Sequence, residues 1–516
     1  MTKSFFEQYE KYILFVVILF AIGIRLPYLN CPIQVDEGAY TYMAHFWLKG
    51  ESLYKTRFFN VLPGLPFLYV IILKFFGESP VAIRAFISFY NALTLVFLYF
   101  AAKKLFGIKE AVITAFIYAY LSWLPHIRGI SGKELFMLLP CVVALYFFLC
   151  YDPKKQYHLF LCGVFSALAI FIRQSALPLV GHFALFLFLQ TPKKPLKAVV
   201  IYLLGVGIPF VFILTYGYFT MGKERFLYQV FRYRIDTNSI FVGPVLYHIL
   251  RCLYSLGASG VVFLILAVIV ANFYLPSKLP QKTFLFSYFL FSFLGAIIGG
   301  NWFFHYYLQL IPIFSLWLGW GTVAIMEKTT LKIKAIYVGL LIIPFIFYLL
   351  AVAYTKDHCL GPEEGNAVNK KVVSYITHHT TPEETIYGLF YHNPSIYFLA
   401  KRKAGAPYLF RDELLFVPKR LEEIEKYIKD KKIDHLITYD LDYTLSIVRM
   451  HCEYDKNNTM NFVKRCFMPN FTPFCQDYPL QITLVRNIFK AIPQQYVKSK
   501  ILAFPKFKVI IWNRRE

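Results

Sequence analysis

The sequence lacks the short motifs by which proteins bind nucleotides and nucleic acids. Neither GxxxxGKS/T nor GxGxxG occurs in its 516 residues, so no loop is expected to cradle a nucleotide phosphate. Zinc-finger spacing, an RNA-binding signature and a basic helix with interleaved aromatic residues are missing as well. The net charge of +24 therefore does not point to a nucleic-acid partner.

Two further features are missing. The acidic and histidine residues show no metal-ligand spacing such as HxxxH, so we predict no dedicated metal site and no cofactor. A loosely held divalent cation remains open. The apolar run from Tyr12 to Ile24 has no small-residue cleavage site after it, so we interpret it as a retained first span and not as a removable signal peptide.

Apolar residues dominate what is present. They make up 58% of the chain, with a mean hydropathy of +0.51, against about 45–50% in globular chains. Apolar segments of spanning length recur between charged residues, which predicts an α-helical polytopic membrane protein. The stretch from Leu62 to Phe76 is short for a span, so we expect an interfacial helix there, in the first outer loop. We predict about eleven transmembrane helices, at residues 11–28, 82–102, 110–126, 134–151, 157–173, 175–190, 197–217, 248–274, 283–299, 304–325 and 333–354.

The basic residues of the loops predict the topology. Alternate loops carry them, and if these loops are cytoplasmic, the N-terminus lies inside and Asp36 lies outside. By parity, all residues after Tyr354 are then outside too. The five loops contain Lys103, Lys104 and Lys109; Lys154 and Lys155; Lys193, Lys194 and Lys197; Lys278 and Lys282; and Lys328, Lys332 and Lys334.

Beyond residue 355 the composition becomes that of a soluble domain. Residues 385–390, 434–439 and 506–512 have the pattern of short strands, and residues 394–400 and 418–432 that of helices. This predicts a small extracytoplasmic α/β domain at residues 356–516, after a transmembrane catalytic domain at residues 1–355.

The nine cysteines fall into two groups. One or two disulfides would suit an extracytoplasmic tail, and the sequence leaves their pairing open. Cysteines in or near spans act as small apolar fillers. The first group comprises Cys31 in the first outer loop and Cys359, Cys452, Cys466 and Cys475 in the tail; the second comprises Cys141, Cys150, Cys162 and Cys252.

Two adjacent carboxylates, Asp36 and Glu37, directly follow the first span. Removing an acidic pair from water at the membrane surface costs free energy, so its presence there needs an explanation. Other loops on the same side carry basic residues that run against the positive-inside rule, so topology does not explain them. The residues expected to converge with the acidic pair on the outer face are Tyr40, Arg84, Arg128, Lys133, Glu134, Arg225, Arg232, Arg234, His305, Tyr306 and Tyr307.

Such a set suits transfer from a lipid-phosphate donor. A carboxylate accepts the proton of an attacking hydroxyl, while arginine and lysine neutralise the charge that builds up on the departing phosphate. The planar guanidinium of arginine binds phosphate oxygens through two parallel hydrogen bonds.

Each of these residues can also have a purely structural role. Asp36 can be a solvated loop residue, and Glu37 can orient the loop through backbone amides. The corresponding structural roles are a snorkelling anchor for Arg84, an ion pair of Glu134 with Lys133 or Arg128, a hydrogen-bonded helix start for His305, and plain loop charge for Arg232 and Arg234.

In their order along the chain, these residues resemble a known family. Asp36-Glu-Gly-Ala-Tyr40 after the first span is similar to the DE…Y signature of the protein O-mannosyltransferase and aminoarabinose-transferase group, in the glycosyltransferase C superfamily. The resemblance covers residues 10–355, with an echo at residues 394–400. Its further motifs are Pro63-Gly-Leu-Pro-Phe-Leu-Tyr69, Arg84-Ala-Phe-Ile-Ser88, Ser131-Gly-Lys-Glu134 and His305-Tyr-Tyr-Leu-Gln-Leu-Ile-Pro312.

The resemblance implies a membrane glycosyltransferase. It would transfer a sugar from a polyprenyl-phosphate carrier to a protein, lipid or glycan on the extracytoplasmic face of a bacterial cell membrane. Asp36, with Glu37 beside it, would be the base or the carboxylate that orients the acceptor. Tyr40 and Arg84 would lie near the donor phosphate.

The sequence departs from the aminoarabinose transferases at one place. Those enzymes carry Glu-Lys before their proline pair, where this chain has Val61-Leu62. An acid and a phosphate-binding cation are thereby lost, so neither lipid A nor aminoarabinose is carried over. The candidate replacements for the missing charge are Arg128, Lys133, Arg232 and Arg234.

Two different functions stay open. A transporter or lipid flippase would need ionisable groups at mid-membrane and often shows internal hydropathy repeats. Here the charged residues lie mostly at one face, and only Arg173, at the outer end of a span, hints at transport. A non-catalytic membrane protein that binds polyprenyl lipid would share the fold but release no lipid phosphate.

Overall fold

The computed structural model describes residues 5–51, 54–123, 132–190, 195–238, 245–276, 279–300, 302–355, 363–391, 393–415, 417–452, 478–504 and 507–515. The chain divides into two compact units. The helical unit comprises Met1–Cys31, Val61–Phe219 and Cys252–Leu360, and the C-terminal unit comprises Pro32–Asn60, Thr220–Arg251 and Gly361–Glu516. The segment that follows the first span therefore belongs to the same unit as the tail. The predicted boundary at residues 355 and 356 stays a prediction.

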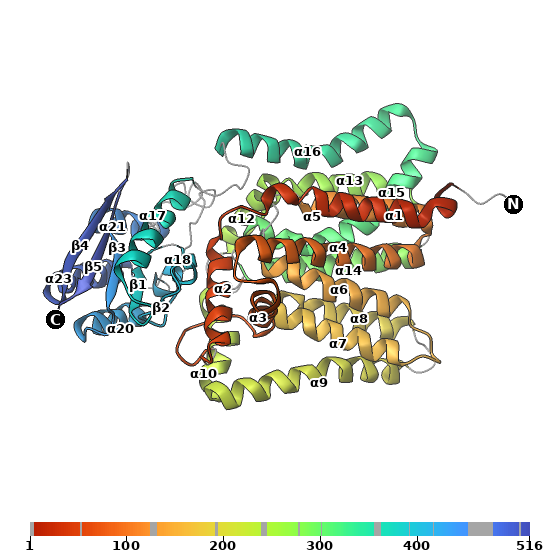
Figure 1. The fold of residues 1–516 in the computed structure, drawn as a ribbon. Coiled ribbons are helices and arrows are strands. Elements are labelled where there is room, and N and C mark those ends of the chain that lie inside the picture. Colours follow the sequence, from red (N-terminus) through yellow and green to blue (C-terminus); the bar gives the residue numbers. More distant parts are fainter. Residues whose placement is uncertain are drawn as a thin grey trace. The chain divides into compact units, whose positions relative to one another are not determined.

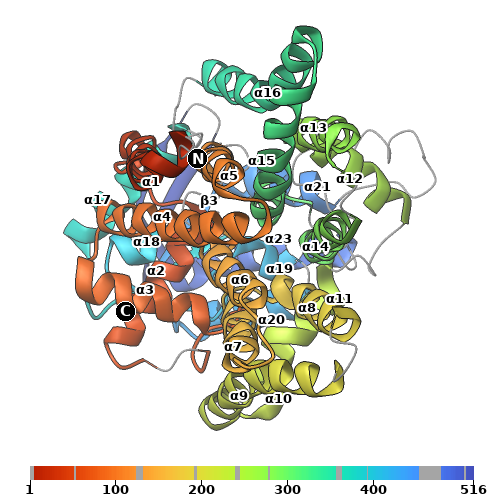
Figure 2. The same cartoon turned by 90° about the vertical axis from the view of Figure 1, so that its right-hand side faces the viewer.

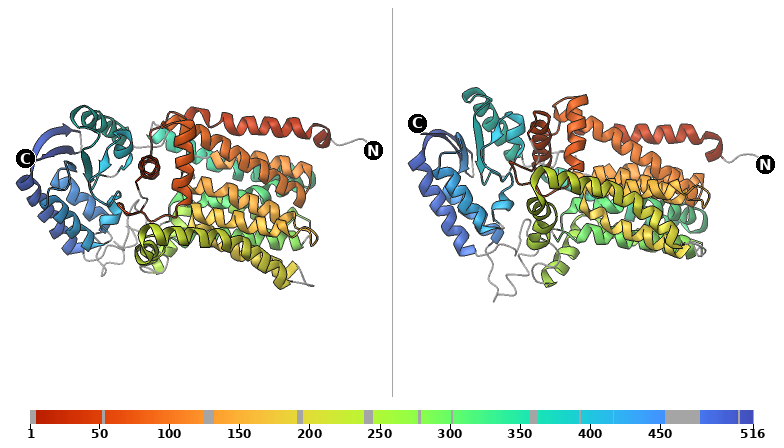
Figure 3. Two further views of the ribbon diagram at one scale, coloured as in Figure 1. Left: turned by 60° about the horizontal axis from the view of Figure 1, so that its bottom comes forward. Right: turned by 90° about the horizontal axis from the view of Figure 1, so that it is seen from below.

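The helical unit is a bundle whose long helices run side by side (Figures 1 and 3). Helix α15 (Ile311–Lys328) is almost wholly buried and packs between α5 (Ile108–Trp123) and α13 (Val261–Tyr274), as the end-on view shows (Figure 2). Glycines permit this approach, because a Cβ at Gly319 would collide with Thr114 and one at Gly321 with Ala271. The other elements are α1 (Phe5–Gly23), η1 (Leu26–Tyr28), α3 (Gly64–Phe76), α4 (Pro80–Leu105), α6 (Lys133–Leu149), α7 (Tyr157–Ile172), η2 (Gln174–Ala176), α8 (Leu177–Gln190), α9 (Pro195–Met221), α14 (Leu279–Ile297), η4 (Phe304–Leu310) and α16 (Leu331–Thr355). Helix α12 (Val245–Ala258) begins in the C-terminal unit and ends in the helical unit.

Several of these helices suit a membrane by length and composition. Among the described residues, four are long and apolar enough to cross one: Phe5–Tyr28, Pro80–Leu105, Pro195–Thr220 and Phe304–Lys328. A fifth is added if α12 and α13, which meet at a bend of 79°, form one broken span. The predicted fold class, a multi-pass helical membrane protein with a small C-terminal sheet, is confirmed. The number of eleven spans, and the position of α3 in the membrane interface, stay predictions.

Helices α7 and α9 touch through two glycines. A Cβ at Gly163 would collide with the carbonyl oxygen of Tyr202, and one at Gly205 with that of Phe160. Gly163→Ala is therefore expected to destabilise the folded protein by about 1–3 kcal/mol, because the added methyl has no room. Thermal unfolding in detergent measures this. The matched control is Gly207→Ala in α9, since no atom lies within 4 Å of a Cβ there. Equal midpoints for the two variants would contradict the close packing.

The C-terminal unit contains a five-stranded mixed sheet in the order β2-β1-β3-β5-β4. Strand β1 (Thr385–Leu389) is parallel to β2 (Lys403–Ala404) and β3 (His435–Tyr439), while β5 (Lys508–Arg514) is antiparallel to β3 and β4 (Tyr496–Ala503). The three predicted strands and the predicted helices are thereby confirmed. The helices are α2 (Val35–Leu48), α10 (Lys223–Leu227), the π-helix η3 (Tyr228–Arg232), α11 (Tyr233–Asn238), α17 (Glu363–His379), α18 (Ser395–Leu399), α19 (Arg411–Leu415), α20 (Pro418–Lys429), α21 (Leu441–Cys452) and α23 (Tyr478–Gln495).

One face of this sheet carries the main core of the unit. Leu421, Ile424 and Ile428 of α20 point at it with the spacing predicted from the sequence, and all three are fully buried. Helices α21 and α23 pack beside α20 against the same core. Helix α17 lies on the other side of the sheet (Figure 1).

The structure describes the state of five cysteines, and the disulfides predicted for the tail stay a prediction. Cys31 is disulfide-bonded, and Cys141, Cys150, Cys162 and Cys252 are free thiols. Cys359, Cys466 and Cys475, together with the side chain of Cys452, lie outside the described part of the chain.

Candidate functional site

Helix α2 begins at the acidic pair. Gln34 and Glu37 form a reciprocal capping box, in which the backbone N–H of Gln34 donates to Glu37 Oε2 at 3.0 Å. The Glu37 side chain is only 2% exposed, so it serves the start of the helix, which favours the loop-orienting role. Asp36, one residue earlier, is exposed in the first helical turn. The partial positive charge of a helix N-terminus favours a carboxylate at this position, and the Asp36 side chain is accessible.

The other predicted residue of α2 is buried. Tyr40 is 2% exposed, and its ring meets that of Phe59 edge to face, with the centroids 6.0 Å apart. The first turn of α2 therefore presents Asp36 outward, while the following turns pack inside the C-terminal unit. Roles of Tyr40 in donor binding and of Glu37 in catalysis stay predictions.

A second constellation lies in the helical unit around Glu134, in the first turn of α6. Its carboxylate forms an ion pair with Arg173, which follows α7 in an extended conformation. His305 Nε2 of η4 lies 3.7 Å from Glu134 Oε1. The guanidinium of Arg173 also stacks over the ring of Tyr306, 4.1 Å from its centroid. The structure thus brings together three predicted residues, Glu134, His305 and Tyr306, and adds Arg173.

Hydrogen bonds fix the two segments that carry these groups. Ser175 Oγ donates to Gln309 Oε1, and Gln309 Nε2 donates to the Ser175 carbonyl oxygen, both at 2.9 Å. Gly295 lets α14 approach this pair, since a Cβ there would collide with both partners. Elements η2 and η4 are therefore locked to each other, which holds Arg173 and His305 in place. Glu134, Arg173, Ser175, His305, Tyr306 and Gln309 are named the Glu134 cluster below.

The sequence contained a signal for Arg173. It is a single cation in the break between two apolar helices, and a charge inside such a run needs a partner. The structural role predicted for Glu134 was an ion pair with Lys133 or Arg128. The partner observed among the described residues is Arg173, from a different pair of helices.

The remaining predicted cations differ in burial. Arg84 in the first turns of α4 is 3% exposed, which argues against the snorkelling role because such an anchor keeps its charge in water. Lys133 is buried as well. Arg232 is exposed and lies 3.4 Å from Asp236 one turn later, as expected of a solvated charge. Arg128 and the side chain of Arg234 lie outside the described residues.

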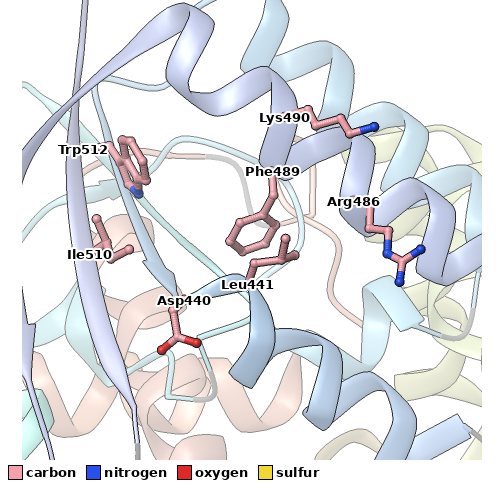
Figure 4. Close-up of a pocket in the computed structure, with 7 residues that line it drawn as sticks. All are labelled: Asp440, Leu441, Arg486, Phe489, Lys490, Ile510 and Trp512. Carbon is pink, nitrogen blue, oxygen red and sulfur yellow. The ribbon is translucent and has the colours of Figure 1, made fainter.

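A cavity of about 350 Å³ opens in the C-terminal unit between α23 and the sheet (Figure 4). Asp440, Arg486 and Lys490 supply its charged groups. The Asp440 carboxylate accepts hydrogen bonds from the amides of Tyr443 and Lys508, both at 2.9 Å. These bonds cap α21 and fix the start of β5, so Asp440 has a structural task. The contacts of Asp440 therefore do not indicate a catalytic site in this cavity.

No group of three or more histidine, cysteine, aspartate or glutamate side chains is placed to hold a metal ion within the described ranges. The expected absence of a dedicated metal site stays a prediction.

Comparison with known proteins found a family model and solved structures to which this chain is similar. A family model described as dolichyl-phosphate-mannose-protein mannosyltransferase matches residues 61–219. No curated protein matches the chain in sequence.

Solved structures share the fold at low sequence identity. The oligosaccharyltransferase AglB from Archaeoglobus fulgidus, with an inhibitory peptide and a dolichol-phosphate, is 11% identical with a TM-score of 0.54, over 86% of this chain and 70% of that one. ArnT from Cupriavidus metallidurans bound to undecaprenyl phosphate is 14% identical with a TM-score of 0.53, over 84% of this chain and 94% of that one. An oligosaccharyltransferase from the same archaeon, in complex with Zn and sulfate, is 11% identical with a TM-score of 0.55, over 87% of this chain and 70% of that one.

The predicted resemblance to the protein O-mannosyltransferase group is confirmed over residues 61–219 by the family match, and the chain shares the fold of AglB and ArnT. The predicted fold of a multi-pass membrane protein with a C-terminal α/β unit is confirmed by the same comparison.

Proposed function

We propose that this protein, a multi-pass membrane protein with the fold of AglB and ArnT, transfers a sugar from a polyprenyl-phosphate carrier to an acceptor hydroxyl or phosphate. The observation that carries the proposal is Asp36, an exposed carboxylate at the start of α2, directly after the first span. The carriers bound in the related structures, dolichol-phosphate and undecaprenyl phosphate, indicate the class of donor.

In the proposed reaction Asp36 acts on the acceptor. The carboxylate orients the attacking oxygen and, where the acceptor is a hydroxyl, takes up its proton. The new bond forms between this oxygen and the anomeric carbon of the sugar, while the bond from that carbon to the phosphate oxygen breaks. The electron pair leaves with the polyprenyl phosphate. Because Glu37 fixes the first turn of α2, Asp36 needs no reorganisation before the step.

Within the helical unit, the Glu134 cluster is the proposed binding site for the phosphate of the lipid carrier. Arg173 offers a planar fork of N–H donors, and His305 offers an imidazole side chain that is only partly buried. Glu134 holds both groups within one site. A transporter is less well supported, because the only cation that hinted at transport, Arg173, forms an ion pair with Glu134.

We further propose that the reaction occurs on the extracytoplasmic face of a bacterial cell membrane. The lysine-rich loops alternate as the positive-inside rule requires. Cys31, five residues before Asp36, is disulfide-bonded, and such bonds persist in oxidising compartments. A reporter fused after residue 48 is expected to be active outside the cytoplasm. A cytoplasmic location would refute the proposed side.

The reaction is tested with membranes that contain the full chain. Lipid extract of the parent strain serves as donor, and the released free lipid phosphate is measured together with the sugar-modified product. Mass spectrometry of surface glycans and lipids from a strain without the gene identifies that product. Tight lipid binding without phosphate release would favour a non-catalytic lipid-binding protein.

A further inference from the structure

Helix α2 packs on α18 of the C-terminal unit with unusually close backbone contact. A Cβ at Gly38 would lie 2.5 Å from the Ser395 amide nitrogen and 2.6 Å from its Cα. These are backbone atoms, which cannot rotate away as a side chain does. Gly38 is two residues after Asp36, so this contact fixes the turn that carries the carboxylate.

Tyr42, one turn further along α2, ties the helix to β2. Its hydroxyl oxygen accepts from the Ala404 amide at 3.0 Å and from Arg57 Nε at 3.1 Å. Arg57 Nη2 in turn donates to the Ala404 carbonyl oxygen. The Tyr42 ring also contacts that of Tyr397 in α18, with the centroids 5.5 Å apart. Tyr42 is 1% exposed, so these contacts are shielded from water.

Tyr397 is itself held in the sheet. Its hydroxyl accepts from the Gly388 amide of β1 at 2.9 Å. Burial raises the pKa of Tyr397, so the phenol stays neutral. The series Tyr42, Tyr397 and Gly388 thus connects α2 to the central strands.

A second connection involves Arg420 at the start of α20. Its guanidinium stacks on Phe58, Tyr233 and Tyr408, with Cζ 3.9, 4.6 and 4.9 Å from the ring centroids. The Phe58 amide donates to the Pro407 carbonyl oxygen at 2.9 Å. These contacts join the segment after α2 and the segment 220–251 to the tail, so the sheet supports both.

We propose that the C-terminal unit is the scaffold that sets the position of Asp36, with Gly38 and Tyr42 as positioning residues. This inference rests on the proposed function. By this proposal the tail affects the transfer step because it sets the orientation of α2. This effect is separate from any contact that the tail makes with the acceptor.

Gly38→Ala tests the proposal. The methyl forces α2 away from α18, and a displacement of about 1 Å at a catalytic group costs on the order of 100-fold in rate. We expect kcat to fall by about that factor, while the half-saturating amount of donor lipid extract changes less than about twofold, because in the proposed function Asp36 of α2 acts on the acceptor. Tyr42→Phe removes one hydroxyl and is expected to lower kcat by about tenfold.

The matched control separates position from stability. Ile428→Ala opens a cavity in the core of the same unit, away from α2, and is expected to lower the midpoint of thermal unfolding with kcat kept within about twofold. Gly207→Ala controls for the change of residue type. If Gly38→Ala and Ile428→Ala lose kcat in proportion to lost stability, or if Gly38→Ala and Tyr42→Phe keep wild-type kcat, the positioning role is refuted.

Asp36→Asn distinguishes this failure from failure of the proposed function. Wild-type kcat in Gly38→Ala and Tyr42→Phe, with an inactive Asp36→Asn, would refute only the scaffold. Full activity in Asp36→Asn would refute the catalytic assignment on which the scaffold rests.

Discussion

Asp36→Asn is expected to lower the rate of sugar transfer by about 10³-fold, since a positioned general base contributes about 10²–10⁴-fold. Asparagine has nearly the same shape as aspartate and can occupy the same exposed place in the first turn of α2. It cannot accept a proton. Membrane insertion, thermal stability and the half-saturating amount of donor should therefore stay as in the wild type. Release of free lipid phosphate from the donor extract gives the rate directly.

Glu37→Gln is the matched control for Asp36→Asn. It changes the neighbouring carboxylate, whose Oε2 accepts from the Gln34 amide. Glutamine can also complete a capping box, so the loss of stability should be below about 1 kcal/mol. We expect at least about half of the wild-type rate. If Glu37→Gln instead lowers the transfer rate as much as Asp36→Asn does, Glu37 takes part in catalysis as directly as Asp36. Full activity in Asp36→Asn would show that Asp36 has no catalytic role.

Breaking the Glu134–Arg173 ion pair has the second largest expected effect. Both side chains are almost fully buried, at 2% and 7% exposure. Arg173→Met leaves the Glu134 carboxylate without its buried counter-charge, and such a loss costs about 3–5 kcal/mol. The double variant Glu134→Gln/Arg173→Met removes both charges and is expected to recover most of this stability. Thermal unfolding of the four members of this double-mutant cycle measures the coupling.

The double variant also tests the proposed role in phosphate binding. A hydrogen bond to a charged group contributes about 1.5–3 kcal/mol, so loss of the Arg173 fork should lower transfer by roughly 10- to 100-fold even when the fold is restored. The double variant keeps the Ser175–Gln309 hydrogen bonds, which join η2 to η4. A wild-type rate of transfer in a stable double variant would show that the Glu134–Arg173 ion pair has only a structural role. Failure to recover stability would show that the stacking of Arg173 on Tyr306 stabilises the fold in addition to the ion pair.

Much of the fold follows from patterns local in the sequence. Helix α20 was predicted from the spacing of Leu421, Ile424 and Ile428, and these three side chains do face the core. Strand β4 was not predicted, because most of its side chains are exposed and an edge strand needs no alternating apolar face. Strand β2 has two residues, too few to produce a pattern.

The candidate site shows the limit of such patterns more clearly. Asp36 was predicted from its place after the first span, and its exposure at a helix start agrees with that. The partner of Glu134 was not predicted, because Arg173 reaches it from the break between two other helices. Sequence spacing reports neighbours along one element, whereas this ion pair depends on how several elements pack. The contact of Gly38 with Ser395 has the same origin.

The contact between Gly38 and Ser395 also determines when during biosynthesis the site can form. Ser395 lies 357 positions after Gly38 (395 − 38), with the whole helical unit encoded between them apart from its first span. At about 5–20 residues per second, the ribosome needs roughly 20 to 70 s to reach α18 after it has made α2. During that time α2 exists without the surface on which it packs. A nascent or truncated chain that stops before α18 therefore carries Asp36 on an unsupported helix, so competence for transfer would be the last property that the newly made protein acquires.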